Sequence, residues 1–593
     1  MARRTRLLGA ATVVLFGAVG AQLVHLSLGS NGPWRVLANQ ETQVRVSLPA
    51  LRGSILARNG AAFATSVARD CIVADPFQIH DPAPEALRLA QLLDEPVGPI
   101  EAALAVHGGY SVVDSAAPLA VGSRIEQLAL DGVLPGITVQ PTQIAEYPLG
   151  DLAEPVVGRV GPAGTGTFGL EYQYQRLLAG QPGWVDERVT AQGVPVPGGV
   201  IAEQPAHAGT SIELTIDPVL QADVESALAK EIEQTRAIGG TAIVMDPHDG
   251  QILAMASLAA PPLPGSRPVP GGGQPVDVPR ALPTESWLND AVAYAYEPGS
   301  VAKIATFAAA LEEHLITPSS TEVVPNQLVI DGSVFHDAES HPTEVLSMAQ
   351  ILARSSNVGT IELAERLGPQ RLVESFHALG WGEPTGLAFP GAAAGYIKPA
   401  SQWSPTAIGS TPIGQDQLVT PLEILDSYNA VANGGVLVTP QLVVGTVGSS
   451  GRLVPAPAPR ARRVMPAWVA SQLLGLLSHV TGPQATAPAA AIPGYAVAGK
   501  TGTSHKPYPD AGGYQPGAYW GTFVGLVPAP HPVLSAIVML DQPVPIYGGM
   551  TAAPVFAQIM RAAIARYGIT PDGQVRSGLL TSLDRAPGQG VTP

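Results

Sequence analysis

Ser300 and Lys303 are the side chains whose types and spacing point most directly to covalent chemistry. They precede an apolar run, residues 304–311, which predicts a buried helix, and Pro298 suits the first turn of that helix. Residues three apart share one face of a helix, so the serine hydroxyl and the lysine amine can meet. The lysine can remove the serine proton if burial and neighbouring positive charge favour its neutral form. Backbone amides at the helix start can then stabilise the oxyanion that forms when Ser300 attacks a carbonyl.

Ser355 and Asn357 form a second candidate pair, in the turn between predicted helices at residues 345–352 and 358–367. A hydroxyl and an amide two residues apart at a turn can both point into a cleft. The alternative is that Ser-Ser-Asn only caps the second helix. Ser-x-x-Lys has an equally plain alternative, an exposed helix pair without a catalytic role, so neither pattern is decisive alone.

Four consecutive residues, Lys500, Thr501, Gly502 and Thr503, close a predicted strand at residues 495–499. Lys500 offers a fixed positive charge, the threonines offer hydroxyls, and the glycine lets a substrate approach the backbone closely. The alternative is an ordinary passage from a strand to a turn. The chain has only five lysines, and two of them, Lys303 and Lys500, belong to these motifs. A lysine amine can lose its proton, whereas an arginine cannot readily do so.

The elements that must position these residues are the helices and strands of the chain from residue 212 onward. Asp217-Pro218 predicts the start of a helix that runs through residues 220–232. A loop rich in proline and glycine is expected at residues 259–283. Strands at both ends of the segment, with helices between them, predict an α+β fold with an antiparallel sheet flanked by helices. Besides the strand that leads to Lys500, the predicted strands are residues 240–245, 250–256, 519–527 and 533–540.

Composition and charge exclude several classes of function. The chain of 593 residues has a formal net charge of −16, which disfavours nucleic acid as a partner. Cys71 is the only cysteine, so an intramolecular disulfide and a cysteine-based metal cluster are both excluded. The sequence contains neither a His-Glu-x-x-His motif nor a Walker-type loop. We therefore expect no metal and no cofactor.

The N-terminus predicts a membrane anchor. Arg3, Arg4 and Arg6 precede an apolar segment, residues 7–28, which is about long enough to span a bilayer as a helix. The arginines favour a cytoplasmic N-terminus, which places everything after residue 28 outside the cytoplasm. The alternative is a cleaved signal peptide, since residues 18–20 resemble a cleavage site.

Residues 29–211 predict a scaffold rather than a second catalytic domain. A short strand is expected at residues 43–48, a turn at Asn59-Gly60 and helical structure within residues 81–106. We find no acid–base or metal-binding constellation there. The predicted organisation is therefore an anchor at 1–28, a non-catalytic region at 29–211, a catalytic domain at 212–575 and a flexible tail at 576–593.

Together the three motifs resemble a known signature. Ser-x-x-Lys, Ser-x-Asn and Lys-Thr-Gly occur here in that order, at intervals of 55 and 145 residues, as in penicillin-binding proteins and serine β-lactamases. Further stretches resemble class B penicillin-binding proteins, which are membrane-anchored monofunctional transpeptidases. These stretches are Arg-Gly-x-Ile at 52–55, Gly-Leu-Glu at 169–171, Tyr-Glu-Pro-Gly-Ser at 296–300 and Gly-Gly-x-x-Ala-Ala-Pro-x-Phe at 548–556. The resemblance covers nearly the whole chain and departs at Ala57, where the family usually has an aspartate.

This resemblance implies an elongated, β-rich pedestal followed by a transpeptidase domain. It also implies acyl transfer from a peptidoglycan stem peptide ending in D-Ala-D-Ala. Ser300 is the implied nucleophile, Lys303 its base and Ser355 the relay of a proton to the leaving D-alanine. Lys500, Thr501 and Thr503 would hold the substrate carboxylate beside Gly502, and Asn357 the peptide backbone. The amides of Ser300 and Thr503 would form the oxyanion hole.

The resemblance also implies partners and leaves alternatives. An amine of a neighbouring stem would resolve the acyl-enzyme, β-lactams would acylate Ser300, and a polytopic membrane glycosyltransferase is the expected partner. A D,D-carboxypeptidase or β-lactamase would use the same residues with water as the acceptor. A non-enzymatic β-lactam sensor or division scaffold would keep only the fold. The sequence does not separate a role in septal division from one in elongation.

The first testable prediction concerns topology. Because Arg3, Arg4 and Arg6 flank the only long apolar run, the catalytic domain should lie outside the cytoplasmic membrane. Protease added to spheroplasts should therefore degrade the chain beyond about residue 28 while a cytoplasmic marker protein stays intact. Full protection of the chain would show that the predicted orientation is wrong.

Overall fold

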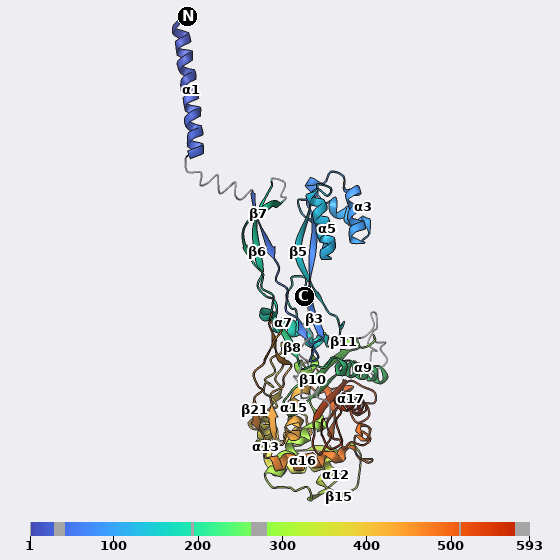
Figure 1. The fold of residues 1–593 in the computed structure, drawn as a ribbon. Helices are drawn as coiled ribbons and strands as arrows, with labels where there is room; N and C mark the ends of the chain where they lie inside the picture. The colour runs from blue at the N-terminus through green and yellow to red at the C-terminus, as the bar shows by residue number, and fades with distance from the viewer. Residues whose placement is uncertain (1, 29–41, 191–194, 262–280, 509–511, 576–593) are drawn as a thin grey trace. The chain divides into compact units, whose positions relative to one another are not determined.

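The computed structural model describes residues 2–28, 42–190, 195–261, 281–508 and 512–575 (Figure 1). The chain divides into two compact units, of which unit 2 contains residues 53–65, 145–178 and 210 onward and unit 1 the remainder. Every candidate site residue lies in unit 2. The predicted domain boundaries stay predictions. The predicted tail at 576–593 and most of the predicted loop at 259–283 lie outside the described residues.

Unit 1 contains an antiparallel three-stranded sheet and a second group of strands with three helices. The first sheet has the order β1 (Gln43–Leu48), β6 (Gly183–Val189), β7 (Pro195–Gln204). In the second group β3 (Ala62–Ala74), which begins in unit 2, pairs with β4 (Ser111–Ala117) and β5 (Ile137–Glu146). The helices are α3 (Pro82–Leu93), α4 (Val97–Leu104) and α5 (Leu119–Leu130). The predicted strand at 43–48 and the predicted helical structure within 81–106 are confirmed.

A six-stranded antiparallel sheet organises unit 2, in the order β11-β10-β9-β24-β23-β22. The two central strands, β9 and β24, come from opposite ends of the catalytic segment, as predicted. The sheet therefore closes only when the C-terminal strands return to the N-terminal hairpin. The strands are β9 (Gly239–Met245), β10 (Ile252–Ala259), β11 (Thr284–Glu285), β22 (Ala498–Pro507), β23 (Tyr514–Val527) and β24 (Leu534–Asp541).

Both faces of this sheet are buried, because successive strand side chains point to opposite faces. Ala242 and Val244 of β9 pack in one core with α9 (Pro218–Thr235) and α17 (Ala552–Tyr567). Ile243 and Met245 belong to the other core. Its helices are α11 (Lys303–Glu312), α13 (Asn357–Ala378), α15 (Pro421–Ala432) and α16 (Ala467–Leu477). The predicted antiparallel sheet flanked by helices is confirmed.

Shorter elements surround these two layers. In unit 2, β8 (Ser211–Leu214) pairs with β2 (Ile55–Leu56) and β19 (Val443–Val447). The buried Ala57 donates its amide to Ala61 O at 2.7 Å, so the turn at Asn59-Gly60 forms without the aspartate that is usual in the family. The other short strands pair as β12 (Thr321–Val324) with β15 (Glu344–Ser347), β13 (Gln327–Ile330) with β14 (Ser333–His336), β16 (Tyr396–Ile397) with β17 (Gln417–Leu418), and β18 (Val436–Val438) with β21 (Ala461–Arg463), while β20 (Leu453–Pro455) pairs with β19. The short helices are α6 (Glu154–Val157), α7 (Gly169–Gln173), α8 (Gln175–Leu178), α10 (Asp290–Ala293), α12 (Met348–Ala353) and α14 (Ala407–Ser410).

Two predicted elements are wrong in their bounds. The strand expected to end at residue 499 is β22, which starts at Ala498 and continues through Lys500-Thr501-Gly502-Thr503 to Pro507. Pairing with β23 keeps these polar residues in the sheet, with Lys500 opposite Val524. The helix expected at 345–352 begins only at Met348, because residues 344–347 form β15 and Ser347 caps α12.

The N-terminal segment forms a helix, α1 (Ala2–Leu28). Among the residues that the structure describes, no helix reaches the combination of length and apolar character that marks a membrane span.

Asp217 ties α9 to α17, the last described helix of the chain, and generates a stability prediction. It caps α9 by accepting hydrogen bonds from the amides of Val219 and Leu220, and it also pairs with Arg566 and accepts a 3.1 Å bond from Tyr567 Oη on α17. Because Asp217 is 3 % exposed, Asp217→Ala should lower the free energy of unfolding by about 2–4 kcal/mol. Chemical denaturation of the full chain measures this.

Asp223→Ala is the matched control, since Asp223 lies on the same helix and is exposed. It should change the free energy of unfolding by less than about 0.5 kcal/mol. An equal loss in both variants would mean that the links of Asp217 to α17 contribute little.

Candidate active site

Ser300 lies in a tight turn that is pressed against the edge strand of the sheet. A 3₁₀ helix, Gly299–Ala302, carries Ser300 and leads directly into α11. Gly299 has φ 61°, and a Cβ at this position would come within 2.9 Å of Thr503 O on β22. Glycine therefore permits both the turn and the close approach. The turn brings the backbone beside Ser300 close to Thr503, whose amide, with that of Ser300, is the predicted oxyanion hole.

Lys303 is buried at the start of α11 and has a dense set of partners. Its side chain is 0 % exposed. Its amine donates to Ser355 O at 2.5 Å, to Asn357 Oδ1 at 2.8 Å and to Ser355 Oγ at 3.2 Å. No hydrogen bond joins Lys303 Nζ to Ser300 Oγ in the described part of the chain. The Ser-x-Asn motif therefore holds the amine of Lys303. Ser300, three residues before Lys303 in the sequence, is partly exposed.

Ser355 is the point where the three motifs meet. Its hydroxyl oxygen accepts a bond from Lys500 Nζ at 2.8 Å as well as the bond from Lys303. Ser355 adopts φ 58°, an uncommon conformation for serine that directs its carbonyl and hydroxyl toward Lys303. The neighbouring Ser356 caps α13 by accepting a bond from Gly359 N at 3.0 Å. Both interpretations of Ser-Ser-Asn therefore hold, because adjacent residues divide the two roles.

Lys500, Thr501, Gly502 and Thr503 lie on β22 at the edge of the sheet. Lys500 and Thr501 are buried, and Thr501 Oγ1 bonds Thr486 Oγ1 at 3.1 Å. Thr503 Oγ1 accepts from Gly548 N at 3.4 Å.

The structure shows a packing role for Gly502. A Cβ on Gly502 would come within 2.9 Å of Pro298 O and 3.3 Å of Val301 Cγ1. Its missing side chain therefore lets the Ser300 turn pack on β22, and its predicted role in admitting a substrate stays a prediction.

Burial changes the acid–base properties of both lysines. Removal from water lowers the pKa of Lys303 to about 7, and the negative charge of Asp337 opposes that shift. Burial also lowers the pKa of Lys500, with the charge of Lys303 adding to the effect. Lys303 can consequently lose its proton near neutral pH, as a base must. Burial therefore acts against a permanent charge on Lys500, and the fixed charge predicted for this lysine stays a prediction.

Asp337 and His336 support the site and were missed in the sequence. Asn357 Nδ2 donates to His336 O at 3.0 Å, and Asp337 Oδ1 accepts from Val358 N at 2.9 Å, at the start of α13. Asp337 Oδ2 also lies 3.1 Å from His341 Nε2. These residues fix the Ser-x-Asn motif from the far side. His336 ends β14 and Asp337 begins the loop that follows, and neither stands in a recognisable pattern, so no sequence signal marks them.

The arrangement suits covalent catalysis by serine. A neutral Lys303 can accept a proton, and Ser355 Oγ lies between the two amines, where it can pass a proton from one to the other. The described residues hold no group of three or more His, Cys, Asp or Glu side chains suited to a metal ion.

Comparison with known proteins identifies the class. Residues 240–561 match the penicillin binding protein transpeptidase domain, and residues 47–214 match the penicillin-binding protein dimerisation domain. The penicillin-binding protein PbpB of Mycobacterium tuberculosis is 30% identical over 94% of this chain and 84% of its own length. The peptidoglycan D,D-transpeptidase FtsI of Escherichia coli is 27% identical over 88% of this chain and 84% of its own.

Solved structures agree. Penicillin-binding protein 3 of Mycobacterium tuberculosis, crystallised with aztreonam, aligns with a TM-score of 0.67 at 27% identity, over 88% of this chain and 98% of that one. A peptidoglycan synthetase from Bifidobacterium adolescentis aligns with a TM-score of 0.69 at 26% identity, over 89% and 97%. Fold and site thus define a serine acyl-transfer protein of the penicillin-binding type. This chain belongs to the penicillin-binding proteins that join a dimerisation domain to a transpeptidase domain.

The influence of Asp337 on Lys303 generates a pH prediction. A negative charge near an amine raises its pKa, so Asp337→Asn should lower the pKa of Lys303 below about 7. The acylation rate of Ser300 by a β-lactam rises with pH as Lys303 loses its proton. That rise should therefore move to lower pH in Asp337→Asn, in which asparagine can still accept the bond from Val358 N.

Asp331→Asn, between β13 and β14, is the control and should leave the pH profile in place. A shift to higher pH in Asp337→Asn would mean that the base is a different group.

Proposed function

We propose that this protein is a serine-type peptidoglycan D,D-transpeptidase, which cross-links stem peptides through an acyl-enzyme on Ser300. The observation that carries the proposal is the position of Ser355 Oγ, 3.2 Å from the buried amine of Lys303 and 2.8 Å from that of Lys500. The names of relatives support it, among them a probable peptidoglycan D,D-transpeptidase PenA of Neisseria gonorrhoeae, 28% identical over 95% of this chain.

The reaction begins when Lys303 takes the proton of Ser300 and Ser300 Oγ attacks the carbonyl between the terminal D-alanines. The carbonyl oxygen gains negative charge and accepts hydrogen bonds from the amides of Ser300 and Thr503. Ser355 then passes a proton to the departing amine, the C–N bond breaks and D-alanine leaves. The amine of a neighbouring stem attacks the ester and releases Ser300.

Substrate binding falls to the residues around this centre. Lys500, Thr501 and Thr503 hold the terminal carboxylate along the edge strand β22. Asn357 holds the peptide backbone, since its amide is already oriented by Lys303 and His336. β-Lactams acylate Ser300 in the same way as the donor. Support comes from related structures described as complexes with ampicillin and aztreonam.

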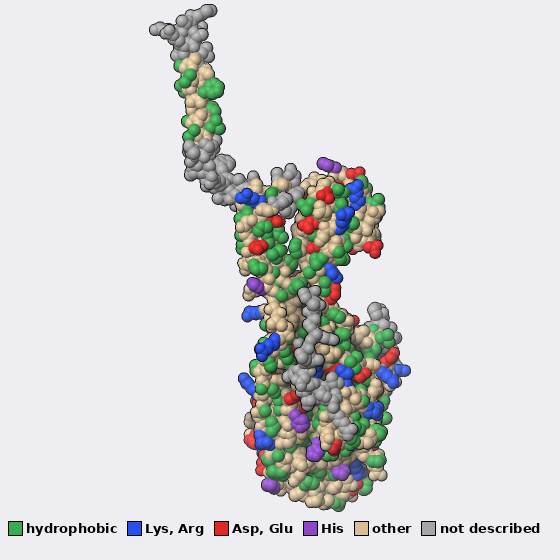
Figure 2. Space-filling view, viewed as in Figure 1, with side chains coloured by type: hydrophobic (Ala, Val, Ile, Leu, Met, Phe, Trp, Pro, Cys, Tyr) green, Lys and Arg blue, Asp and Glu red, His purple; other side chains and the backbone are tan. Residues whose placement is uncertain are grey.

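The location follows from the N-terminal segment. We assign the protein to the cytoplasmic membrane as a single-pass protein, with an extracytoplasmic catalytic domain. Along the described middle of α1, Val13, Phe16 and Leu23 are 72%, 72% and 62% exposed, and Figure 2 shows hydrophobic side chains there without charged ones. Such side chains suit a lipid environment. A polytopic glycosyltransferase that supplies glycan strands is the proposed membrane partner, in septal or elongation synthesis.

The function is tested by offering the full chain a stem peptide ending in D-Ala-D-Ala together with an amine acceptor. We expect D-alanine release and a peptide joined to the acceptor, both detected by mass spectrometry. Ser300→Ala should abolish both, because no other hydroxyl replaces the nucleophile. Release of D-alanine with water as the only acceptor would instead identify a D,D-carboxypeptidase.

The roles of the two lysines are tested by arginine substitutions. Arginine keeps the positive charge but cannot act as a base near neutral pH. Lys303→Arg should therefore slow acylation of Ser300 by a β-lactam by roughly 10²–10⁴-fold, close to the effect of Lys303→Ala. Lys500→Arg should be milder, since a charge for the substrate carboxylate remains.

The measurement is the second-order acylation rate of each variant, with the site of modification located by peptide mapping. A near-normal rate in Lys303→Arg together with a loss in Lys500→Arg would reverse the two roles.

A further inference from the structure

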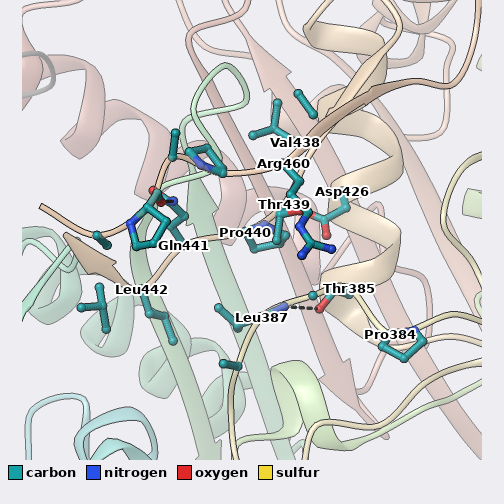
Figure 3. Close-up of a pocket in the computed structure, with 18 of the residues that line it drawn as sticks. Pro384, Thr385, Leu387, Asp426, Val438, Thr439, Pro440, Gln441, Leu442 and Arg460 are labelled. Carbon is teal, nitrogen blue, oxygen red and sulfur yellow. Dashed lines mark hydrogen bonds between the residues drawn. The ribbon is translucent and has the colours of Figure 1, made fainter. Parts of the chain in front are cut away.

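A cavity of about 1020 Å³ lies in unit 2 and has no residue in common with the site around Ser300. It is bounded by α15, by the turn at residues 383–388 and by the chain from β18 to β21 (Figure 3). Its walls are largely apolar and include Leu387, Val438 and Leu442. Its size lies near the upper end of the range for small-molecule sites.

Asp426 is the one acid on the cavity wall with a buried carboxyl oxygen that has no hydrogen-bond partner among the described residues. It lies on α15, is 5 % exposed and projects toward Thr439 and Arg460 (Figure 3). Its Oδ1 atom is buried and has no hydrogen-bond partner among the residues described. A buried polar atom without a partner is costly, and such atoms are rare in folded proteins.

Glu423, one turn earlier on the same helix, makes the contrast clear. It also lines the cavity, but its Oε1 accepts from Gly382 N at 3.0 Å and Gly395 N at 3.1 Å, and its Oε2 from Thr420 N at 2.7 Å. Both carboxyl oxygens of Glu423 thus have hydrogen-bond partners within the protein. In Asp426, by contrast, Oδ1 lacks a hydrogen-bond partner among the described residues.

Two arginines also line the cavity, and neither forms an ion pair with Asp426 among the described residues. Arg462 donates to Ala378 O at 2.8 Å and to His377 O at 3.4 Å, so its guanidinium is directed elsewhere. Arg460 is exposed, and no ion pair joins it to Asp426 in the described chain. Glu383 is exposed at the edge. Hence the protein supplies no cation to the buried carboxyl, although one lies near the opening.

We propose that this cavity binds a small organic amine with an apolar body, whose ammonium group pairs with the Asp426 carboxyl group. The apolar walls would take the hydrocarbon part, and Thr385 and Thr439 offer hydroxyls beside it. Once Asp426 has lost its proton, charge complementarity with its carboxylate favours a cation over an anion or a neutral alcohol.

The protonation of Asp426 sets the pH dependence of binding. Burial raises the pKa of Asp426, repulsion from Glu423 adds to this, and the Asn429 amide opposes it. The Asp426 carboxyl therefore keeps its proton at pH values where an aspartate is normally ionised. An incoming ammonium ion displaces that proton, which leaves to solvent, so affinity should increase with pH until Asp426 ionises by itself.

A cysteine introduced into the cavity tests the proposal in the full chain. Cys71 is first replaced by serine, and Thr439→Cys then places a single thiol in the cavity. The thiol is labelled by methanethiosulfonates that end in an ammonium, a sulfonate or a methyl group, and rates are measured by mass spectrometry. Relative to Ser450→Cys on an exposed turn, the ammonium-to-sulfonate rate ratio should be about tenfold higher and should increase with pH.

Two variants of the cavity must act in opposite directions. Asp426→Asn should bring the ratio down to that of the exposed control, and Arg460→Gln should increase it. Phenethylamine should slow labelling of Thr439→Cys by the methyl reagent in a saturable manner, and 2-phenylethanol should not. Acylation of Ser300 by penicillin in each variant verifies folding.

An equal ratio at the two cysteines, or protection by both phenethyl compounds alike, would overturn the proposal. If Asp426→Asn does not fold, the Arg460→Gln variant and the phenethylamine protection still decide the question. A ratio that fails to respond to Arg460→Gln, together with no protection, would likewise refute it.

Discussion

Two lysine amines buried around one serine hydroxyl are the constraint on which the rest of the structure depends. Lys303 and Lys500 are both 0 % exposed, and both donate to Ser355 Oγ. Removing an amine from water is costly, and two together repel each other, so the arrangement persists only if the surrounding fold is rigid. Catalysis by Lys303 as a base requires this burial, because a solvated lysine would stay protonated near neutral pH.

The rigidity comes from the packing of the elements that carry and surround the motif residues. All nine residues from Lys303 to Leu311 on α11 are buried, and so is every residue of α15 behind it. From α15, Tyr428 Oη donates to Val301 O at 3.0 Å, directly after Ser300. On the other side the absent side chains of Gly299 and Gly502 let the Ser300 turn lie against β22. The nucleophile is therefore fixed by a helix and a strand that meet only in the folded chain.

How far the sequence predicts this site depends on the kind of contact. Ser300, Lys303, Ser355 and Lys500 could be found because their chemistry demands those residue types at short, fixed spacings. The sheet could be found because apolar strands stand at both ends of the segment. Asp337 and Tyr428 could not, since a loop acid and a buried aromatic look the same in any sequence. The strand end at residue 499 was misplaced because β22 continues with polar residues, which sheet pairing and the active site require.

The charges of the site also suggest how a bound substrate would favour the neutral, basic form of Lys303. Burial lowers the pKa of both amines, and the positive charge of one disfavours that of the other. A substrate carboxylate beside Lys500 would stabilise a proton there and so raise the pKa of Lys500. The newly fixed charge on Lys500 would then favour the neutral form of Lys303, whose pKa already lies at about 7. Substrate binding and activation of Ser300 would thus be coupled through Ser355, which lies between the two amines, and a ligand without a negative group would occupy the site without completing the base.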